Sequence, residues 1–171
     1  MGPAGLFCGY YLAKWGYRPI LIERGEPVEE REKTVRAFWD GGELNPESNV
    51  QFGEGGAGTF SDGKLNTLVK DKSGRNHRVL EDFVQFGAKE EILYVNKPHI
   101  GTDVLKNVVK NIREEILKLG GEIQFSTKMT GIEYTQTERG KVISAINTSR
   151  GTIETEVLVL AVGHSSRDTF E

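Results

Sequence analysis

The chain has 171 residues, of which 37% are hydrophobic and 27% are charged, and its formal net charge is -3. This length fits one medium-sized domain or part of a larger one, and the apolar content is sufficient for a hydrophobic core. The single cysteine, Cys8, excludes an internal disulfide, a CxxC redox pair and a cysteine-built zinc site, and the mildly acidic balance gives no indication of a nucleic-acid partner.

The amino-terminal segment predicts a helix followed by a short strand. Apolar residues recur at helical spacing from Pro3 to Trp15, and Gly16 ends the pattern. The apolar run Pro19–Glu23 then ends in an acid, which is typical of a strand buried on both faces of a parallel sheet. A helix, a tight turn and a buried strand together form the second half of a βαβ unit.

A charge-rich helix and a long loop come next. Glu29–Trp39 carries Val35, Phe38 and Trp39 on one side, which predicts a helix with a solvated face. The following stretch, residues 40–63, lacks periodicity and contains seven of the 21 glycines in the chain. Such clustering marks backbone that turns sharply or approaches something closely. Because long loops inside compact domains are usually functional, we expect an ordered functional loop here.

The central part of the chain predicts two further helices. Leu65–Val69 is a candidate strand, and Val79–Phe86 is a predicted helix that Gly87 ends. The strongest helical pattern, Asp103–Leu119, has a continuous apolar stripe and Thr102 as its expected N-cap.

The carboxyl-terminal third predicts strands. Glu122–Phe125 alternates as a strand does, and Gly131–Ile153 has the turn chemistry of a β-meander. Val157–Val162 is a second apolar run, closed by Gly163, which we expect to be a buried strand. This run is far shorter than the ~20 residues that a membrane span requires. Because Met1–Gly5 also lacks the start of a secretory leader, we expect a cytoplasmic protein with no membrane partner.

The opening residues match most of a dinucleotide-binding fingerprint. That fingerprint, G-x-G-x-x-G between a strand and a helix, places a pyrophosphate at the helix N-terminus and a distal acid on the ribose hydroxyls. Gly2 and Gly5 fit its second and third glycines, and Glu23 fits the acid, while the first glycine and the strand before it are absent. Each feature alone also fits a plain helix N-terminus or a surface acid, but their conjunction with the buried strand favours nucleotide binding.

Several stretches resemble a family of flavoproteins. Gly2–Leu6 together with Leu21–Gly25 is similar to the FAD-binding start of flavoproteins with two dinucleotide-binding domains. Gly53–Leu65, Asn96–Asp103 and Leu160–Asp168 resemble one branch of them, the poorly characterised bacterial FAD-dependent dehydrogenases known broadly as NAD(P)/FAD-dependent oxidoreductases. The resemblance extends over nearly the whole chain and is most specific in the glycine loop and the final segment.

The resemblance implies where FAD would bind. Gly2 and Gly5 would face the pyrophosphate, Glu23 would bind the adenosine ribose, and Arg24 would lie beside the adenine or its ribose. Residues 55–65 would pass near the flavin, Met129 would hold adenine through backbone atoms, and the final strand would return to the cofactor. The implied cofactor contacts are Gly2, Pro3, Ala4, Gly5, Glu23, Arg24, Gly55, Gly56, Gly58, Thr59, Ser61, Met129, Ala161 and Gly163.

No residue stands out as a catalytic acid, a catalytic base or a metal ligand. His77 lies in a polar stretch and is expected to face solvent, and His99 follows a proline at an expected turn. His164 follows the apolar run that leads to the expected cofactor cleft, and Cys8 is expected to be a buried thiol. The catalytic residues are left open, since in a flavoprotein the cofactor carries the redox step and the protein positions and tunes it.

Together these features predict an α/β fold, a partial Rossmann-like FAD-binding domain with a β-meander insertion and without its first strand. Residues 1–95 would form the N-terminal FAD-binding part with the glycine-rich loop, and residues 96–171 would form the helix, the meander and the returning strand. We expect the chain to be a fragment, truncated at both ends, that neither retains FAD well nor turns over by itself.

The leading functional hypothesis is an FAD-dependent oxidoreductase that transfers hydride through the flavin. NAD(P)H is a candidate electron donor, and the small-molecule substrate and the oligomeric state are left open. Two alternatives remain, an RNA-modifying enzyme with an FAD fold and a non-catalytic nucleotide-binding module, and the acidic balance counts against the first of them. An NAD-only Rossmann domain is disfavoured because the glycine-rich loop follows Asp40, where such domains usually continue to a third strand.

Overall fold

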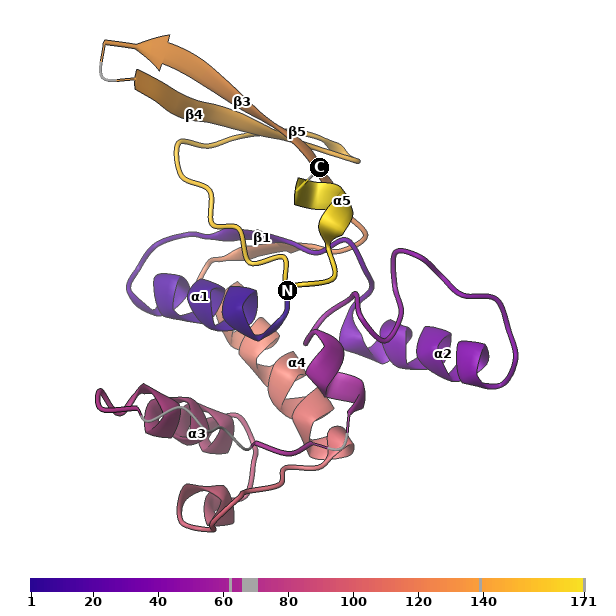
Figure 1. The fold of residues 1–171 in the computed structure, drawn as a ribbon. Coiled ribbons are helices and arrows are strands. Elements are labelled where there is room, and N and C mark those ends of the chain that lie inside the picture. The colour runs from indigo at the N-terminus through magenta and orange to yellow at the C-terminus, as the bar shows by residue number, and fades with distance from the viewer. Residues whose placement is uncertain (62, 66–70, 139, 171) are drawn as a thin grey trace.

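The computed structural model describes residues 1–61, 63–65, 71–138 and 140–170. The helices are α1 (Pro3–Lys14), α2 (Val28–Trp39), α3 (Arg75–Gln85), α4 (Thr102–Lys118) and α5 (Arg167–Phe170), with 3-10 turns at Ala57–Phe60 and Glu90–Leu93 (Figure 1). The strands are β1 (Ile20–Ile22), β2 (Glu122–Gln124), β3 (Met129–Thr137), β4 (Gly140–Thr148) and β5 (Gly151–Glu154). The fold is therefore mixed α/β, with a parallel sheet and an antiparallel sheet. In the described ranges, no helix is long and apolar enough to cross a membrane.

The hydrophobic core lies where α1 packs against α4. Val108, Ile112 and Ile116 of α4 are fully buried and belong to one apolar cluster with Leu6 and Tyr10 of α1. Burying a side chain of this size contributes about 1.5–3 kcal/mol. The α1–α4 contact therefore holds α1 in place, and with it the helix end that the sequence singles out.

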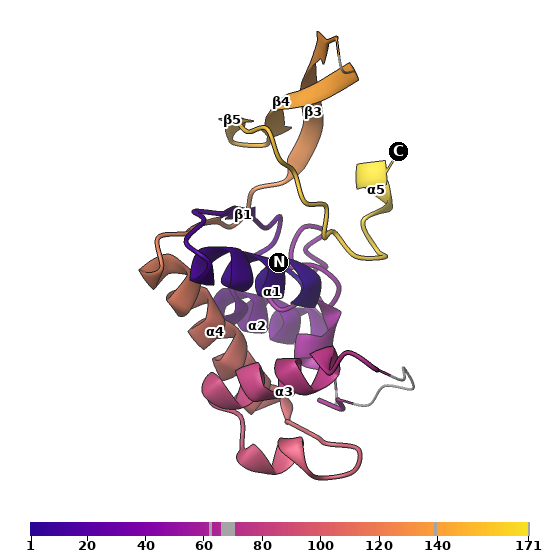
Figure 2. The ribbon, with the colours of Figure 1, turned by 90° about the vertical axis from the view of Figure 1, so that its left-hand side faces the viewer.

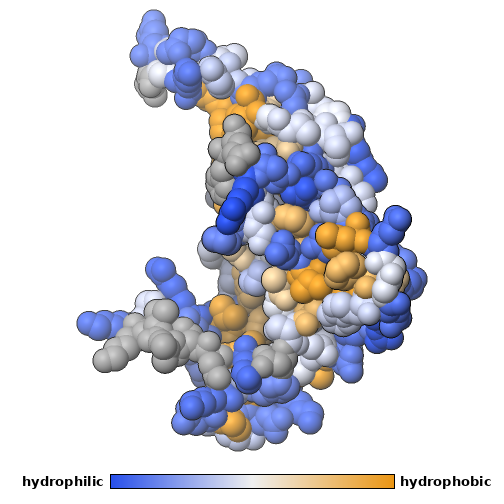
Figure 3. All heavy atoms as spheres, turned by 45° about the vertical axis from the view of Figure 1, so that its right-hand side comes forward, coloured by the Kyte–Doolittle hydropathy of each residue, from blue (hydrophilic) through white to orange (hydrophobic). Residues whose placement is uncertain are grey.

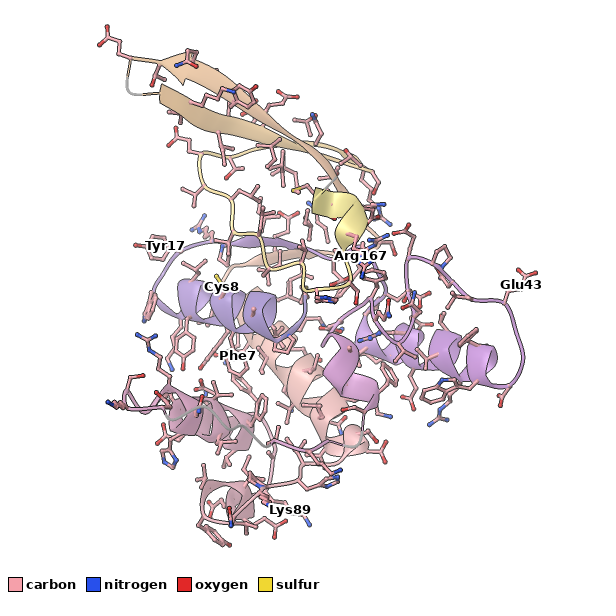
Figure 4. All side chains as sticks on the ribbon, in the orientation of Figure 1. Phe7, Cys8, Tyr17, Glu43, Lys89 and Arg167 are labelled. Carbon is pink, nitrogen blue, oxygen red and sulfur yellow. The ribbon has the colours of Figure 1, made fainter. Side chains whose placement is uncertain are left out.

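Neighbouring side chains leave α1 on opposite sides. Phe7 points toward α3, and its ring centre lies 5.6 Å from that of Phe83, whereas Cys8 points to the other side of the helix (Figure 4). Cys8 is half-buried, so the expected buried thiol is only partly enclosed. This is because α4 and α3 cover one side of α1 and the narrow parallel sheet covers the other.

The parallel sheet consists of β1 and β2, with Leu21 opposite Ile123. Leu21 is buried, but Ile20 is 47% exposed, so the prediction of a strand buried on both faces is only partly confirmed. Among the described residues β1 pairs with β2 alone, and this sheet is too narrow to cover both of its faces. The parallel pairing places the carboxyl ends of both strands at the same edge.

The strands β3, β4 and β5 form the antiparallel meander that the turn chemistry predicts. The β3–β4 hairpin extends away from the helices (Figures 1 and 2). Its far end is mostly hydrophilic, while apolar side chains gather nearer the middle of the molecule (Figure 3). The meander is thus an appendage to the α1–α4 core.

The apolar run Val157–Val162 is not a strand, in contrast to the prediction. It has no regular secondary structure, and Val157, Val159 and Leu160 are 76%, 57% and 49% exposed. An extended segment becomes a strand only when a neighbouring backbone pairs with its N–H and C=O groups. No described strand pairs with this run, which instead leads from β5 back toward the N-terminus (Figure 1).

Two helices begin at other residues than predicted. Helix α3 begins at Arg75 rather than Val79. The prediction missed its first turn because the polar residues there add nothing to the apolar periodicity. The N-cap of α4 is Gly101, with φ 76°, and not Thr102, which already belongs to the helix. The predicted strand Leu65–Val69 lies outside the described residues except for its first position.

Candidate functional site

The N-terminus of α1 presents backbone N–H groups without a side-chain cap. Gly2 is the N-cap in an extended conformation, Pro3 follows at the first helical position, and the first turn contains no acid. Pro3 and Ala4 are exposed and Gly5 is half-buried. Because the free amides and the helix dipole are both positive at this end, it is a favourable place for an anion.

The glycine-rich loop closes directly on this helix end. Gly55 donates its N–H to the carbonyl oxygen of Met1 at 3.0 Å. A Cβ atom on Gly56, where φ is 70°, would lie 3.1 Å from both Cα of Gly2 and Cδ of Pro3. Such a distance is tighter than ordinary packing, so glycine at this position allows the loop to approach α1.

The carboxyl-terminal segment reaches the same place. Cβ of Ala161 lies 3.5 Å from the position that a Cβ atom on Gly5 would occupy. Gly163 follows with φ 75° and is exposed. Figure 2 shows the segment, in yellow, passing the N-terminus of the chain. The structure therefore brings Ala161 to the start of α1 although the run before it is not a strand.

Glu23 lies beside the start of α1, at the end of β1. The residue is 6% exposed, and its carboxylate forms an ion pair with the amino group of Met1 and accepts the N–H of Gly25 at 2.9 Å. Its carbonyl oxygen accepts the N–H of Thr127, beyond the end of β2, at 2.8 Å. The helix end and the distal acid of the fingerprint thus meet at one place.

A cavity of about 300 Å³ lies at the carboxyl ends of β1 and β2, lined in part by Arg24, Ser48, Ser126 and Lys128. The guanidinium of Arg24 lies 4.2 Å from the centre of the Phe52 ring. In open α/β sheets, ligands bind beyond the carboxyl ends of parallel strands. This cavity, which we call the strand-end cavity, is therefore where the topology expects a ligand.

Asp168 of α5 pairs with both cations of the strand-end cavity. Its carboxylate accepts a hydrogen bond from Arg24 at 3.1 Å and one from Lys128 at 2.6 Å. The hydrogen bonds from Lys128 and Arg24 lower the pKa of Asp168. An anionic ligand in this cavity would compete with Asp168 for the same two side chains.

Met129 does not itself line the strand-end cavity. It begins β3 and pairs with Thr148, whereas Lys128, its neighbour in the chain, reaches the cavity. The Lys128 backbone is bonded to Ser149, through Lys128 N–H to the serine hydroxyl at 3.0 Å and Ser149 N–H to the lysine carbonyl at 2.8 Å. The meander therefore fixes the backbone at the rim of the cavity.

A second cavity, of about 150 Å³, lies between the glycine-rich loop, α1, α3 and α4. Its lining is mostly apolar, with Phe7 and Phe83 from the helices and Gly58 and Ser61 from the loop. The Ser61 hydroxyl donates to the carbonyl oxygen of Gly58 at 2.9 Å. The Thr59 side chain, by contrast, is fully buried inside the loop and does not line this cavity. Its hydroxyl is therefore not placed to bond the flavin, in contrast to the prediction.

Buried charged residues support the loop from beneath, and the sequence reasoning missed them. Arg31 of α2 is fully buried and donates to carbonyl oxygens of the loop. Glu54 is fully buried, accepts the N–H of Val28 at 2.8 Å and a hydrogen bond from Arg113 at 2.6 Å, and burial raises its pKa to about 7. The loop itself held the signal, since an ordered, glycine-rich loop leaves carbonyl groups that need donors.

The three histidines lie at the surface. His77 is 58% exposed, as predicted, and lies 3.6 Å from Glu81. His99 is exposed and its backbone forms an isolated bridge with Lys64, and His164 is exposed near the end of the apolar run. In the part of the chain that the structure describes, no group of His, Cys, Asp and Glu residues is placed to hold a metal ion.

Comparison with known proteins finds a close relative in sequence and a likeness in structure. No protein-family model matches the chain. An uncharacterized protein of Clostridium beijerinckii is 55% identical over 170 residues, which cover 99% of this chain and 31% of that protein. The chain thus spans about a third of the length of this curated relative.

The structural likeness is to a protein of low sequence identity. The crystal structure of Thermovibrio ammonificans THI4 superposes with a TM-score of 0.50 at 18% identity, covering 86% of this chain and 44% of that one. At this identity the likeness is one of fold alone, and it agrees with the mixed α/β architecture described above.

Proposed function

We propose that this chain is the FAD-binding part of an oxidoreductase. One observation carries the proposal: the uncapped start of α1 lies beside the Glu23 carboxylate, and the strand-end cavity begins at the next residues, Arg24 and Gly25, where two parallel strands end. Dinucleotides bind at this position in doubly wound α/β folds. The likeness to THI4 supports a fold of the same kind.

The residues present fit the adenosine diphosphate half of FAD. A volume of about 300 Å³ is at the lower end of the ~300–1,000 Å³ typical of ligand pockets, which suits a nucleoside rather than the whole cofactor. The first-turn amides of α1 would bind the pyrophosphate, and Glu23 would accept the ribose hydroxyls. Arg24 and Lys128 would flank the adenine end, with Met129 behind them at the start of β3.

The glycine-rich loop would line the path toward the flavin. Gly55 and Gly56 already contact the start of α1, and Gly58 and Ser61 line the second cavity beyond them. FAD would supply the hydride chemistry, with NAD(P)H as a candidate donor, and the protein would orient it. Since the relative is about three times as long, we assign substrate binding to the rest of the protein.

The test uses protein produced from the complete reading frame that encodes these residues. We expect it to bind FAD, with flavin absorbance at ~450 nm, and the bound flavin to be reduced anaerobically by NADH or NADPH. Arg24→Met should weaken ADP binding by about tenfold or more, because it removes a cation of the strand-end cavity. Arg75→Met, at an exposed position of α3, is the matched control and should leave ADP binding unchanged.

The outcomes separate the candidate functions. The proposed site is contradicted if the unmodified protein binds neither FAD nor ADP. It is also contradicted if the Arg24→Met variant binds ADP as tightly as the unmodified protein does. A protein that binds ADP or FAD but is not reduced by any nicotinamide donor or substrate contradicts the oxidoreductase and supports a non-catalytic nucleotide-binding module.

A further inference from the structure

The side chain of Arg31 is the structural centre of the glycine-rich loop. Arg31 belongs to α2, is 0% exposed, and makes hydrogen bonds to backbone carbonyl oxygens on both sides of the loop. The acceptors, with their distances, are the carbonyl oxygens of Asn49 (2.9 Å), Val50 (3.0 Å), Gly53 (3.3 Å), Glu54 (2.6 Å) and Gly56 (2.9 Å). These bonds tie residues 49–56 to one rigid group.

Only an arginine satisfies this set of acceptors. The guanidinium is planar, carries N–H donors on all of its nitrogens and accepts no hydrogen bonds, so it matches a ring of carbonyl groups. A lysine ammonium carries three donors on a single nitrogen, which are too few and too closely placed for five carbonyl acceptors. A buried carbonyl group that loses its donor costs ~1–3 kcal/mol, so the loop depends on this one side chain.

The loop sequence is adapted to the passage of Arg31. Gly53 has φ 115°, and a Cβ atom there would overlap Cδ of Arg31. The ring of Phe60, from the 3-10 turn that follows, lies 4.8 Å from the guanidinium carbon. The absence of a side chain at position 53 therefore leaves room for the Arg31 side chain, and the aromatic ring at position 60 covers its guanidinium.

The charge of Arg31 is retained although it is buried. Burial lowers the pKa of Arg31 to about 10, and the carboxylates of Glu23 and Glu54 act in the opposite direction. The side chain is thus cationic at neutral pH. The carboxylates that favour its charged form are Glu23, beside α1, and Glu54, within the loop.

The stretch that Arg31 holds is also the stretch that contacts α1. Gly55 bonds to the carbonyl oxygen of Met1, and Gly56 packs on Gly2 and Pro3. Moving the carbonyl groups on either side of these glycines would move the loop away from the helix end. The contact between the loop and the helix end therefore depends on the carbonyl groups that the buried Arg31 holds.

We propose that Arg31 is the positioning residue of the nucleotide site, acting by fixing the backbone of residues 49–56 as a wall beside the N-terminus of α1. The identity of the ligand in this inference rests on the proposed function, whereas the effect of Arg31 on the loop does not.

The test compares Arg31→Lys and Arg31→Met with Arg36→Met in protein from the complete reading frame. Arg36 lies on the same helix, with its side chain 68% exposed, and pairs with Glu32, so it controls for the loss of a cation from α2. Amide hydrogen exchange reports the loop and the buried α4 separately. Calorimetric titration with ADP reports the site.

We expect Arg31→Met to speed exchange in residues 49–56 by about tenfold or more while α4 keeps its protection, and to weaken ADP binding by about tenfold or more. Arg31→Lys should fall between Arg31→Met and the unmodified protein, and Arg36→Met should change neither measurement. With Arg31→Ala, added ethylguanidinium should restore part of the ADP affinity, and ethylammonium at the same concentration should not.

Three results would overturn the inference. The first is unchanged exchange in the loop of Arg31→Met, and the second is unchanged ADP affinity despite a loosened loop. The third result concerns the case in which Arg31→Met also loses protection in α4, so that the whole fold is disturbed. The Arg31→Lys variant then tests the inference, and a folded Lys variant that binds ADP like the unmodified protein refutes a positioning role. If the unmodified protein binds neither ADP nor FAD, the proposed function fails, while loop exchange still decides whether Arg31 positions the loop.

Discussion

Replacing Glu54 by glutamine should change how the stability of the protein depends on pH. The Oε2 atom of Glu54 accepts hydrogen bonds from Val28 and Arg113, while Oε1 is buried without a partner among the described residues. Burial raises the pKa of Glu54 to about 7, although the Val28 amide and Arg113 favour the charged form and Glu29 opposes it. The protonated carboxyl is therefore favoured in the folded protein relative to the unfolded chain.

The size of the effect follows from linkage between protonation and folding. The pKa rises from 4.5 in the unfolded chain to about 7 in the folded one, and each pKa unit corresponds to ~1.4 kcal/mol, so Glu54 accounts for about 3 kcal/mol. Because the folded pKa is the higher one, this stability is fully present below about pH 4.5 and is lost as pH rises through about 7. For a domain of ~150–250 residues, about 3 kcal/mol corresponds to a shift of roughly 6–12 °C in Tm.

The assay is thermal unfolding of the unmodified protein and of Glu54→Gln between about pH 5 and pH 8. Glutamine keeps the size of the side chain and does not titrate, so Tm of the variant should rise relative to the unmodified protein as pH increases. Glu114→Gln, at an exposed position of the same α4 that carries Arg113, is the control and should show no such trend. A Tm difference that stays constant across this range would mean that the Arg113 ion pair outweighs the burial of Glu54.

Three further predictions concern the core, the loop and the strand-end cavity. Ile112→Ala should destabilise the protein by about 2–5 kcal/mol in urea unfolding, because Ile112 is fully buried in the α1–α4 contact. Gly53→Ala should loosen the loop in hydrogen exchange far more than Gly74→Ala, since φ is positive at both but only Gly53 lies against a buried side chain. Asp168→Asn should tighten ADP binding measured by calorimetry, because it frees Lys128 and removes one of the two carboxylates that hold Arg24, the other being Glu47, and weaker binding would contradict this.

Local patterns predicted the elements that make up the core and the backbone of the site. The apolar periodicity of α1 and α4 and the turn residues of the meander are short-range signals, and the structure confirms all of them. The start of α1 lies beside Glu23 in the structure because a tight turn joins a helix to a parallel strand in few ways, whereas their role in nucleotide binding stays a prediction. The run Val157–Val162 was placed wrongly because a strand depends on a partner, and composition does not reveal whether one is present.

The buried support of the loop was not predictable by the same means. Arg31 lies in a charge-rich stretch, and its neighbours in α2, such as Arg36 and Lys33, are solvated as the pattern indicates. Arg31 is buried because carbonyl groups of residues 49–56 accept its hydrogen bonds, and Glu54 is buried because Arg113 of α4 pairs with its carboxylate. Long-range hydrogen bonds of this kind leave no periodic trace in the sequence.

The cost of these buried charges indicates what they are for. Removing one member of a buried charge network is strongly destabilising, whereas replacing a whole network by apolar residues is often neutral or stabilising. If Arg31 and Glu54 served stability alone, Arg31→Met combined with Glu54→Met should restore both stability and ADP binding. We expect the double variant at about pH 8 to recover part of the stability lost in Arg31→Met, with a coupling of about 0.5–3 kcal/mol in urea unfolding, because it no longer buries a carboxylate that has lost one of its two nearby cations, Arg31, and keeps only Arg113. ADP binding should not recover, because the loop carbonyl groups still lack the guanidinium that holds them beside α1. Recovery of both together would show that the network stabilises the fold without shaping the site.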